Sequence, residues 1–188
     1  AEFGLAGDDD FRVKVSPDGS AWHDALAIDQ ASGGASLPAS PWATGTNLLI
    51  NGDMAINQRG FAGGALAAAA YGFDRWKAAT GGANLSFGGF TITLTSGAII
   101  QPVEPAFWGL ASFVGLPLTL SVENLSGGSL AVTIGSQSGS ITAGSGRRSV
   151  TLTPAGGDTG VLQVRLSPGA GAVSFTRIKL ERGPLATN

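Results

Sequence analysis

The side chains of this sequence that are best suited to chemistry are aromatic rings and planar polar groups near turns. Trp108 lies in a segment bounded by Gly and Pro, and Gln101 and Glu104 precede it. An indole ring can stack on the C–H groups of a sugar, and an amide or a carboxylate can pair with neighbouring hydroxyls. These three residues are therefore candidates for holding a saccharide. The alternative for Trp108 is that it closes one end of the hydrophobic core.

A second group of candidates surrounds an Ala- and Gly-rich loop at residues 62–70. Gln58 and Arg59 precede this loop, and Tyr71 closes it. A guanidinium group donates parallel hydrogen bonds in a fixed geometry, which suits pairs of adjacent acceptor oxygens. We predict that both groups form one ligand site, made of Trp108, Tyr71, Gln58, Arg59, Gln101 and Glu104.

Catalytic groups are sparse. The single histidine is His23, and no Gly-x-Ser-x-Gly motif is present to expose a nucleophile. Carboxylates that could act in pairs stand at Asp53, Asp74, Glu104, Glu123, Asp158 and Glu181. None belongs to an aromatic and acidic cleft motif, so we predict that the protein is not an enzyme. The alternative, a polysaccharide depolymerase, requires two carboxylates about 5–10 Å apart in a cleft.

Composition limits the class of partner. Charged residues make up 13% of the 188 residues, against roughly 25% in average globular proteins. The net charge of −2 gives no basic stripe, which argues against a nucleic-acid partner. The longest apolar stretch, residues 105–118, is too short to span a bilayer and contains Gly and Pro. We therefore expect no membrane insertion, and expect this stretch to be a buried connector.

Apolar residues alternate with polar ones through most of the chain after residue 46. This period of two indicates strands with one face in a core, and Gly- and Pro-rich turns separate them. The clearest examples are Leu118, Leu120 and Val122, then Leu130, Val132 and Ile134, then Leu162, Val164 and Leu166. We predict an all-β fold, a β-sandwich over residues 46–188.

The last strand breaks the alternation. Val173 and Phe175 share one parity, whereas Ile178 and Leu180 share the other. A β-bulge at residues 176–177 would turn both pairs toward the core, because the extra residue shifts the alternation by one.

Residues 1–45 have a different character. Phe11, Val13 and Val15 alternate before a Pro-Asp-Gly turn, and the return segment carries Trp22 and Leu26 at even spacing. This pattern predicts a β-hairpin followed by a linker at residues 31–46. A lone hairpin is marginally stable, so we expect it to assemble into a homotrimeric stem. The alternative is that the hairpin folds back on its own sandwich.

Several of these segments resemble one family of proteins. The segment from Asn47 to Gly60, NLLINGDMAINQRG, and the segment YGFDRW that ends at Trp76 resemble the opening of carbohydrate-binding-module-like jelly rolls. Those jelly rolls occur in receptor-binding spikes and fibres of tailed phages and gene transfer agents. FRVKVSPDGS near the N-terminus resembles their stalks, and IKLERGPLAT near the C-terminus resembles their closing strand.

The resemblance implies a jelly-roll sandwich behind a short β-hairpin stem. It implies a protein on the surface of a virion or phage-like particle that binds host cell-surface or capsular polysaccharide without catalysis. Its partners would be that polysaccharide, two further copies in a homotrimer and other particle proteins. A structural virion module that attaches subunits is the alternative.

No organic cofactor is expected, and the same resemblance implies a structural calcium ion. Such jelly rolls often hold Ca²⁺ near their terminal strands. Asn51, Asp53 and Glu181 supply hard oxygen atoms in matching places.

Overall fold

The computed structural model describes residues 2–5, 9–31, 33–36 and 45–187, with backbone alone for residues 2–5 and 36. The chain forms two compact units, Ala1–Trp42 and Ala43–Asn188, which we call the N-terminal unit and the C-terminal unit. The linker predicted at residues 31–46 falls mostly outside the described residues. Within the described part of the chain, no helix is long and apolar enough to cross a membrane.

The N-terminal unit is a small antiparallel sheet built around the predicted hairpin. Its described strands follow the chain order β1 (Glu2–Leu5), β2 (Phe11–Val15), β3 (His23–Ile28) and β4 (Ala35–Ser36). The hairpin of β2 and β3 is confirmed, and β1 and β4 extend it on both sides. Its turn is closed by Asp18, whose carboxylate accepts hydrogen bonds from the backbone of Ser20 and Ala21.

The described part of the C-terminal unit contains a nine-stranded antiparallel sheet and one short 3₁₀ helix. The elements are β5 (Gly64–Leu66), β6 (Lys77–Gly88), β7 (Thr91–Val103), η1 (Pro105–Trp108), β8 (Leu118–Ser126), β9 (Leu130–Ile134), β10 (Gln137–Ile141), β11 (Gly144–Leu152), β12 (Leu162–Pro168) and β13 (Val173–Arg182). Their order in the sheet is β10-β9-β12-β7-β13-β8-β11, with β6 paired to β7 and β5 paired to β6.

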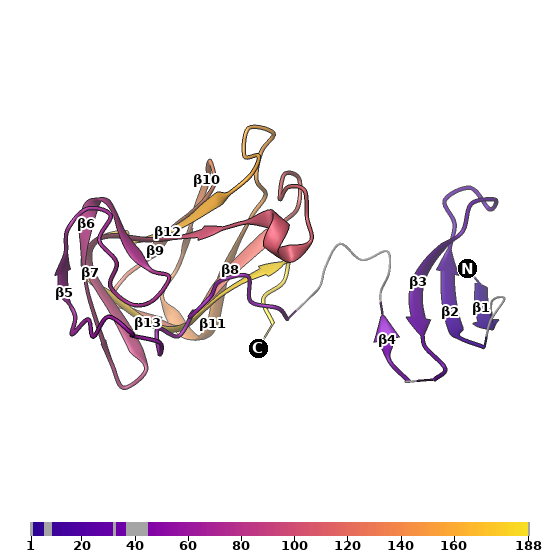
Figure 1. Ribbon diagram of the computed structural model, residues 1–188, viewed down its shortest axis with the longest axis horizontal. Coiled ribbons are helices and arrows are strands. Elements are labelled where there is room, and N and C mark those ends of the chain that lie inside the picture. The colour runs from indigo at the N-terminus through magenta and orange to yellow at the C-terminus, as the bar shows by residue number, and fades with distance from the viewer. Residues whose placement is uncertain (1, 6–8, 32, 37–44, 188) are drawn as a thin grey trace. The chain divides into compact units, whose positions relative to one another are not determined.

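The long strand β7 folds this sheet into two layers. Residues 99–103 of β7 pair with β12, and residues 92–94 pair with β13. The two halves of one strand therefore belong to opposite layers, which Figure 1 shows with β12, β9 and β10 on one side and β13, β8 and β11 on the other. The predicted all-β jelly-roll sandwich is confirmed.

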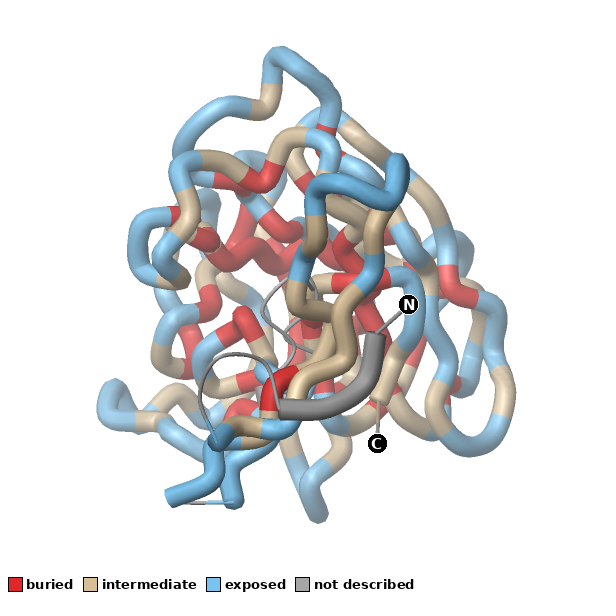
Figure 2. The backbone as a smooth tube through the Cα atoms, turned by 90° about the vertical axis from the view of Figure 1, so that its right-hand side faces the viewer, coloured by how far each residue is buried: buried red, intermediate tan, exposed pale blue. Residues whose placement is uncertain are grey.

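The core lies between the two layers. The alternating apolar residues of β8, β9 and β12 named above are at most 3% exposed. Trp76, Phe113 and Phe175 are the largest side chains buried with them. Figure 2 shows buried positions gathered along the strands and exposed positions at the turns. Burial of apolar surface is the main stabilising term of such a sandwich.

The predicted bulge in β13 is confirmed. The pairing of β13 with β8 shifts register on both sides of Thr176, and Arg177 has a φ of 51°. As a result Phe175 and Ile178 both point into the core despite their opposite parity.

The prediction that residues 105–118 cross the core is wrong. Only Pro105, Phe113 and Leu118 are buried in this stretch, and the rest of it is partly or fully exposed along the edge of the core. A connector inside the core would leave backbone N–H and C=O groups without partners, so the chain keeps such segments outside.

The bend of β7 leads to a prediction at Gly97. Its φ is 72°, and a Cβ there would lie 2.2 Å from the carbonyl oxygen of Gly82. Gly97→Ala is expected to lower the free energy of unfolding by about 3 kcal/mol, since it adds a clash to left-handed strain. Urea denaturation of both forms would measure this difference.

Gly89→Ala is the matched control, because Gly89 has a φ of 56° but open space around its Cβ position. Gly89→Ala should lower the free energy of unfolding by about 1 kcal/mol, which is the cost of the left-handed strain alone. Equal effects of the two substitutions would show that the close approach to Gly82 does not constrain the bend.

Candidate functional site

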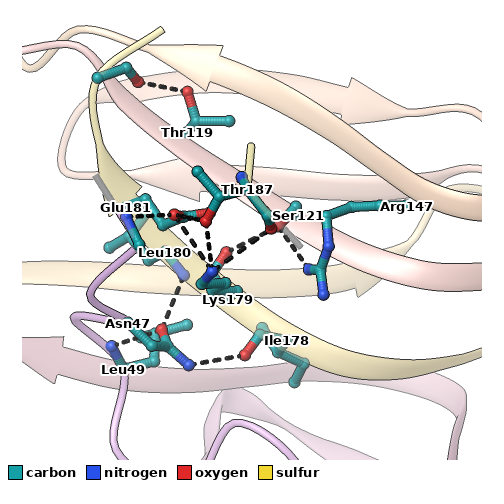
Figure 3. Close-up of polar contacts among 12 residues, drawn as sticks. Asn47, Leu49, Thr119, Ser121, Arg147, Ile178, Lys179, Leu180, Glu181 and Thr187 are labelled. Atoms are coloured by element: carbon teal, nitrogen blue, oxygen red, sulfur yellow. Dashed lines mark hydrogen bonds and ion pairs between the residues drawn. The ribbon is translucent and has the colours of Figure 1, made fainter. Parts of the chain in front are cut away.

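The segment at residues 45–52 lies along β13 and is fixed there by buried polar groups. The Asn47 side chain accepts hydrogen bonds from the backbone N–H of Leu49 and Leu180, and donates one to the carbonyl of Ile178. The backbone N–H of Leu48 donates to the carbonyl of Leu180 at 2.7 Å. Figure 3 shows Asn47 bridging this segment to β13.

Glu181 fixes the same region from the other side. Its buried carboxylate accepts hydrogen bonds from the backbone N–H of Gly45 and from the N–H and hydroxyl of Thr187. It also pairs with Lys179 at 3.3 Å (Figure 3). Burial would raise the pKa of Glu181, but the hydrogen bonds from Thr187 and the pairing with Lys179 outweigh it and hold the pKa below its ordinary value of 4.5.

Gln101 makes a third link to this segment. Its amide oxygen accepts a hydrogen bond from the backbone N–H of Ile50 at 2.7 Å, and its amide nitrogen donates to the Ile50 carbonyl at 2.9 Å. The side chain is 1% exposed. The amide of Gln101 therefore pairs with the backbone and positions Ile50, and its contact with a ligand stays a prediction.

Beside Ile50 lies a depression of about 320 Å³, which we call the aromatic hollow. It is lined by Leu48, Ile50, Arg75, Gln101, Pro102, Glu104, Phe107 and Trp108. Three predicted site residues, Gln101, Glu104 and Trp108, thus line one depression.

The turn η1 presents two aromatic rings to the aromatic hollow. Pro105 begins the turn, and Gly109 ends it with a φ of 69°. Phe107 and Trp108 contact edge to face, with centroids 5.1 Å apart. Trp108 is half-buried against the core, whereas Phe107 is 69% exposed. Trp108 therefore supports the ring of Phe107, which faces solvent.

An ion pair completes the lining of the aromatic hollow. Arg75 lies 3.7 Å from Glu104, and both side chains are roughly half exposed, at 43% and 44%. Arg75 has a φ of 70°, a strained conformation for an arginine. The hollow therefore offers a guanidinium and a carboxylate beside an exposed aromatic face.

The other three predicted site residues do not line the aromatic hollow. Tyr71 is exposed, but Arg59 lies over its ring at 5.1 Å, and Lys77 lies 5.8 Å from the ring centre. Gln58 is exposed, and its backbone N–H donates to the carboxylate of Asp74. The two predicted groups are therefore separate, and Arg59 covers a ring face that Tyr71 would need for stacking on a sugar.

Two residues of the aromatic hollow, Phe107 and Arg75, were not among the predicted site residues. Neighbouring residues in a 3₁₀ turn point in different directions, so one ring of the Phe107–Trp108 pair faces solvent and the other packs inward. The sequence shows the pair but not which ring is outside. Arg75 reaches the hollow only because the chain turns sharply between Tyr71 and β6.

The three calcium candidates have the following surroundings. The Asn51 amide holds its own turn through the backbone of Ile56 and Asp74. Asp53 is exposed, and Glu181 pairs with the donors described above. Among the described residues, no cluster of three or more His, Asp or Glu side chains is placed to hold a metal.

Neither a protein-family model nor a curated protein matches this sequence. Among solved structures, the chain is similar to a mutant of the family 29 carbohydrate-binding module CBM29-2 complexed with cellulohexaose. The TM-score is 0.39 at 14% identity, over 64% of this chain and 88% of that one.

A CBM4 structure gives a TM-score of 0.40 at 14% identity, over 71% of this chain and 99% of that one. Another mutant of a family 29 module gives 0.37 at 12%, over 63% and 89%.

The Glu181 links lead to a prediction on pH. Because the folded-state pKa lies below the ordinary value, the charged carboxylate stabilises the fold above pH 4.5, and this contribution is lost as the pH falls through the folded-state pKa. Glu181→Gln is expected to lower the free energy of unfolding at neutral pH by about 2–4 kcal/mol. The difference from wild type should shrink in acid, as denaturation curves at both pH values would show.

Glu104→Gln serves as the control, because Glu104 is half exposed and its pairing with Arg75 is worth about 1 kcal/mol at most. A difference for Glu181→Gln that stays constant from neutral to acid pH would contradict the assigned role of its charge.

Proposed function

We propose that this chain binds bacterial cell-surface or capsular polysaccharide without catalysis. The observation that carries the proposal is the aromatic hollow, where an exposed Phe107 ring stands beside the Arg75–Glu104 pair. The ring provides an apolar face for sugar C–H groups. The guanidinium and the carboxylate provide a donor and an acceptor for hydroxyls on the edge of the same sugar.

The ion pair in the aromatic hollow can give way to hydrogen bonds with a sugar. An exposed ion pair contributes little to stability, so Arg75 and Glu104 can turn from each other to sugar hydroxyls at small cost. Trp108 packs on the core beneath the hollow, and Gln101 bonds to the backbone of Ile50. Neither interaction has to break when a sugar binds. Such a site holds a saccharide chain and leaves its glycosidic bonds intact.

We further propose that the chain is a receptor-binding spike or fibre protein on the surface of a phage-like particle, either a tailed phage or a gene transfer agent. The resemblance of the segments at residues 47–76 and 178–187 to such proteins supports this particular role. In that setting the N-terminal unit would join copies of the chain and face other particle proteins.

The N-terminal unit has a surface that suits a homotrimer. Phe11 and Val15 on β2 are 40% and 46% exposed. The intervening Arg12 forms an ion pair at 2.6 Å with Asp24 on β3, so one face of the hairpin is ion-paired and the other is apolar. Three such units could bury their apolar faces together, and three linked saccharide sites could raise avidity by about 10²–10⁴.

A polysaccharide depolymerase remains the enzymatic rival. Asp53 and Glu123 both line one depression, which is the arrangement that favours this rival. Incubation of the protein with purified capsule and an assay for new reducing ends separates the two functions, since passive binding releases none.

The non-catalytic proposal predicts the effect of removing one ring. Phe107→Ala should weaken binding to the polysaccharide that the wild-type chain retains on a bacterial glycan array by about tenfold, the worth of one stacking contact. Because Phe107 is largely exposed, the melting temperature should stay unchanged.

Tyr71→Ala is the matched control, because Tyr71 is an exposed ring outside the aromatic hollow. It should leave affinity unaltered. Affinity that survives Phe107→Ala, or that falls equally with Tyr71→Ala, would remove the hollow as the binding site. A wild-type protein that retains nothing on the array would instead favour a purely structural virion module.

The trimer proposal predicts the mass in solution. Light scattering should give three times the 18.7 kDa chain mass. Val15→Lys should shift the protein toward a monomer, because it places a charge on the apolar face. Arg148→Glu, an exposed charge change on β11, should not. A wild-type monomer at micromolar concentration would contradict the proposal.

A further inference from the structure

A second concave surface lies on the C-terminal unit, distinct from the aromatic hollow. It consists of two depressions of about 460 and 520 Å³ that share Asp53 and Arg177. We call the pair the β13 groove, because the bulge of β13 lies in it. None of the residues that line the aromatic hollow lines either depression.

Three side chains of the β13 groove stand on strained backbone. Phe90 in the two-residue β6–β7 turn, Asn124 on β8 and Arg177 on β13 have φ values of 66°, 53° and 51°. All three line the larger depression. Asparagine tolerates this conformation, whereas phenylalanine and arginine rarely adopt it. Strained backbone conformations of this kind cluster at functional sites. Here they occur in three segments that line one depression.

The strained side chains are also strongly exposed. Phe90 is 74% exposed, and the Arg177 side chain is 72% exposed. Phe90 has little packing to justify its position, since most of its ring faces solvent. Glycine would fit either position without strain. The turn and the bulge explain the backbone conformation at these two positions, but not the choice of a large side chain over glycine.

The charges in the groove favour an anion at Arg177. Glu123 pairs with Arg147 at 2.6 Å, and its contact with Arg177 is longer, at 3.5 Å. Arg147 and Lys179 line the adjoining depression, where Arg147 is paired with Glu123 and Lys179 with Glu181, so Arg177 is the cation left for a ligand. Arg177 is thus exposed and only weakly paired. Its guanidinium can form two parallel hydrogen bonds with an incoming carboxylate, the geometry that arginine and carboxylate groups prefer.

We propose that the β13 groove binds an acidic saccharide, a chain that contains uronate units. The uronate carboxylate pairs with Arg177, and the sugar ring stacks on Phe90. Hydroxyls of the same unit reach Asp53 and Asn124. This second site goes beyond the aromatic hollow and specifies the charge class of the ligand, and it holds whether or not the hollow binds sugar.

The test uses the full chain and two probes with the same sugar backbone, a hexamer of galacturonic acid and its methyl ester, which has neutral carboxyl groups. Calorimetric titration should show binding of the acid form, and binding of the ester weaker by about tenfold or more, the worth of one charge-assisted hydrogen bond. Added salt should weaken binding of the acid form.

Arg177→Gln and Phe90→Ala should each weaken binding of the acid form by about tenfold. Arg165→Gln is the matched control, because Arg165 is an exposed arginine of β12 outside the groove. Arg177→Gly and Phe90→Gly should lose binding while the melting temperature is unchanged or higher, which separates loss of the site from loss of the fold.

Three results would overturn the proposal: equal binding of acid and ester, no binding of the acid form at millimolar concentration, or equal effects of Arg177→Gln and Arg165→Gln. Phe107→Ala distinguishes this site from the aromatic hollow. It should leave uronate binding intact. If it abolishes that binding while Arg177→Gln has no effect, the hollow is the only site and the β13 groove is not one.

Discussion

The structure depends on how the bulged strand β13 satisfies its polar groups. A bulge shifts the hydrogen-bond ladder, and buried backbone groups that lose their strand partners must find others. The segment at residues 45–52 supplies them. Asn47 bonds to Leu180 and Ile178, and the carbonyl of Gly52 accepts a hydrogen bond from the Ile178 N–H at 2.9 Å. Gly52 is required here, since a Cβ would lie 2.1 Å from the Ile178 carbonyl oxygen.

This fixed segment forms a wall of both candidate binding surfaces. Leu48 and Ile50 line the aromatic hollow, whereas Asn47, Leu49 and Asn51 line the β13 groove. Residues 49–52 form a bend and a turn, and Asn51 has a φ of 58°, so the side chains of this segment reach both surfaces. Gln101 holds Ile50 at the hollow, and Glu181 holds the start of the segment at Gly45. The hydrogen bonds that satisfy β13 thus also position the two surfaces.

Much of the fold could be predicted because it follows from local rules. Alternation of apolar residues located the strands, and the change of parity between Phe175 and Ile178 located the bulge. The site could be predicted only in part, because it depends on contacts between distant segments. Gln101 looks like a ligand-binding amide in the sequence, yet it pairs with Ile50, which is 51 residues away. The sequence locates the bulge at Arg177 but not the depression around it, because Phe90, Asn124 and Arg177 come together there from three different segments.

The most direct test of passive saccharide binding at the aromatic hollow is a titration of the full chain followed by ¹H–¹⁵N NMR. The ligand would be fragments of bacterial capsular polysaccharide. The indole N–H of Trp108 and the backbone amides of Phe107 and Arg75 should shift saturably, while the indole N–H of Trp76, which is buried and bonded to Asn51, should not. Saturable shifts that leave Trp108, Phe107 and Arg75 unchanged, or no shifts at all, would contradict the assignment of the hollow.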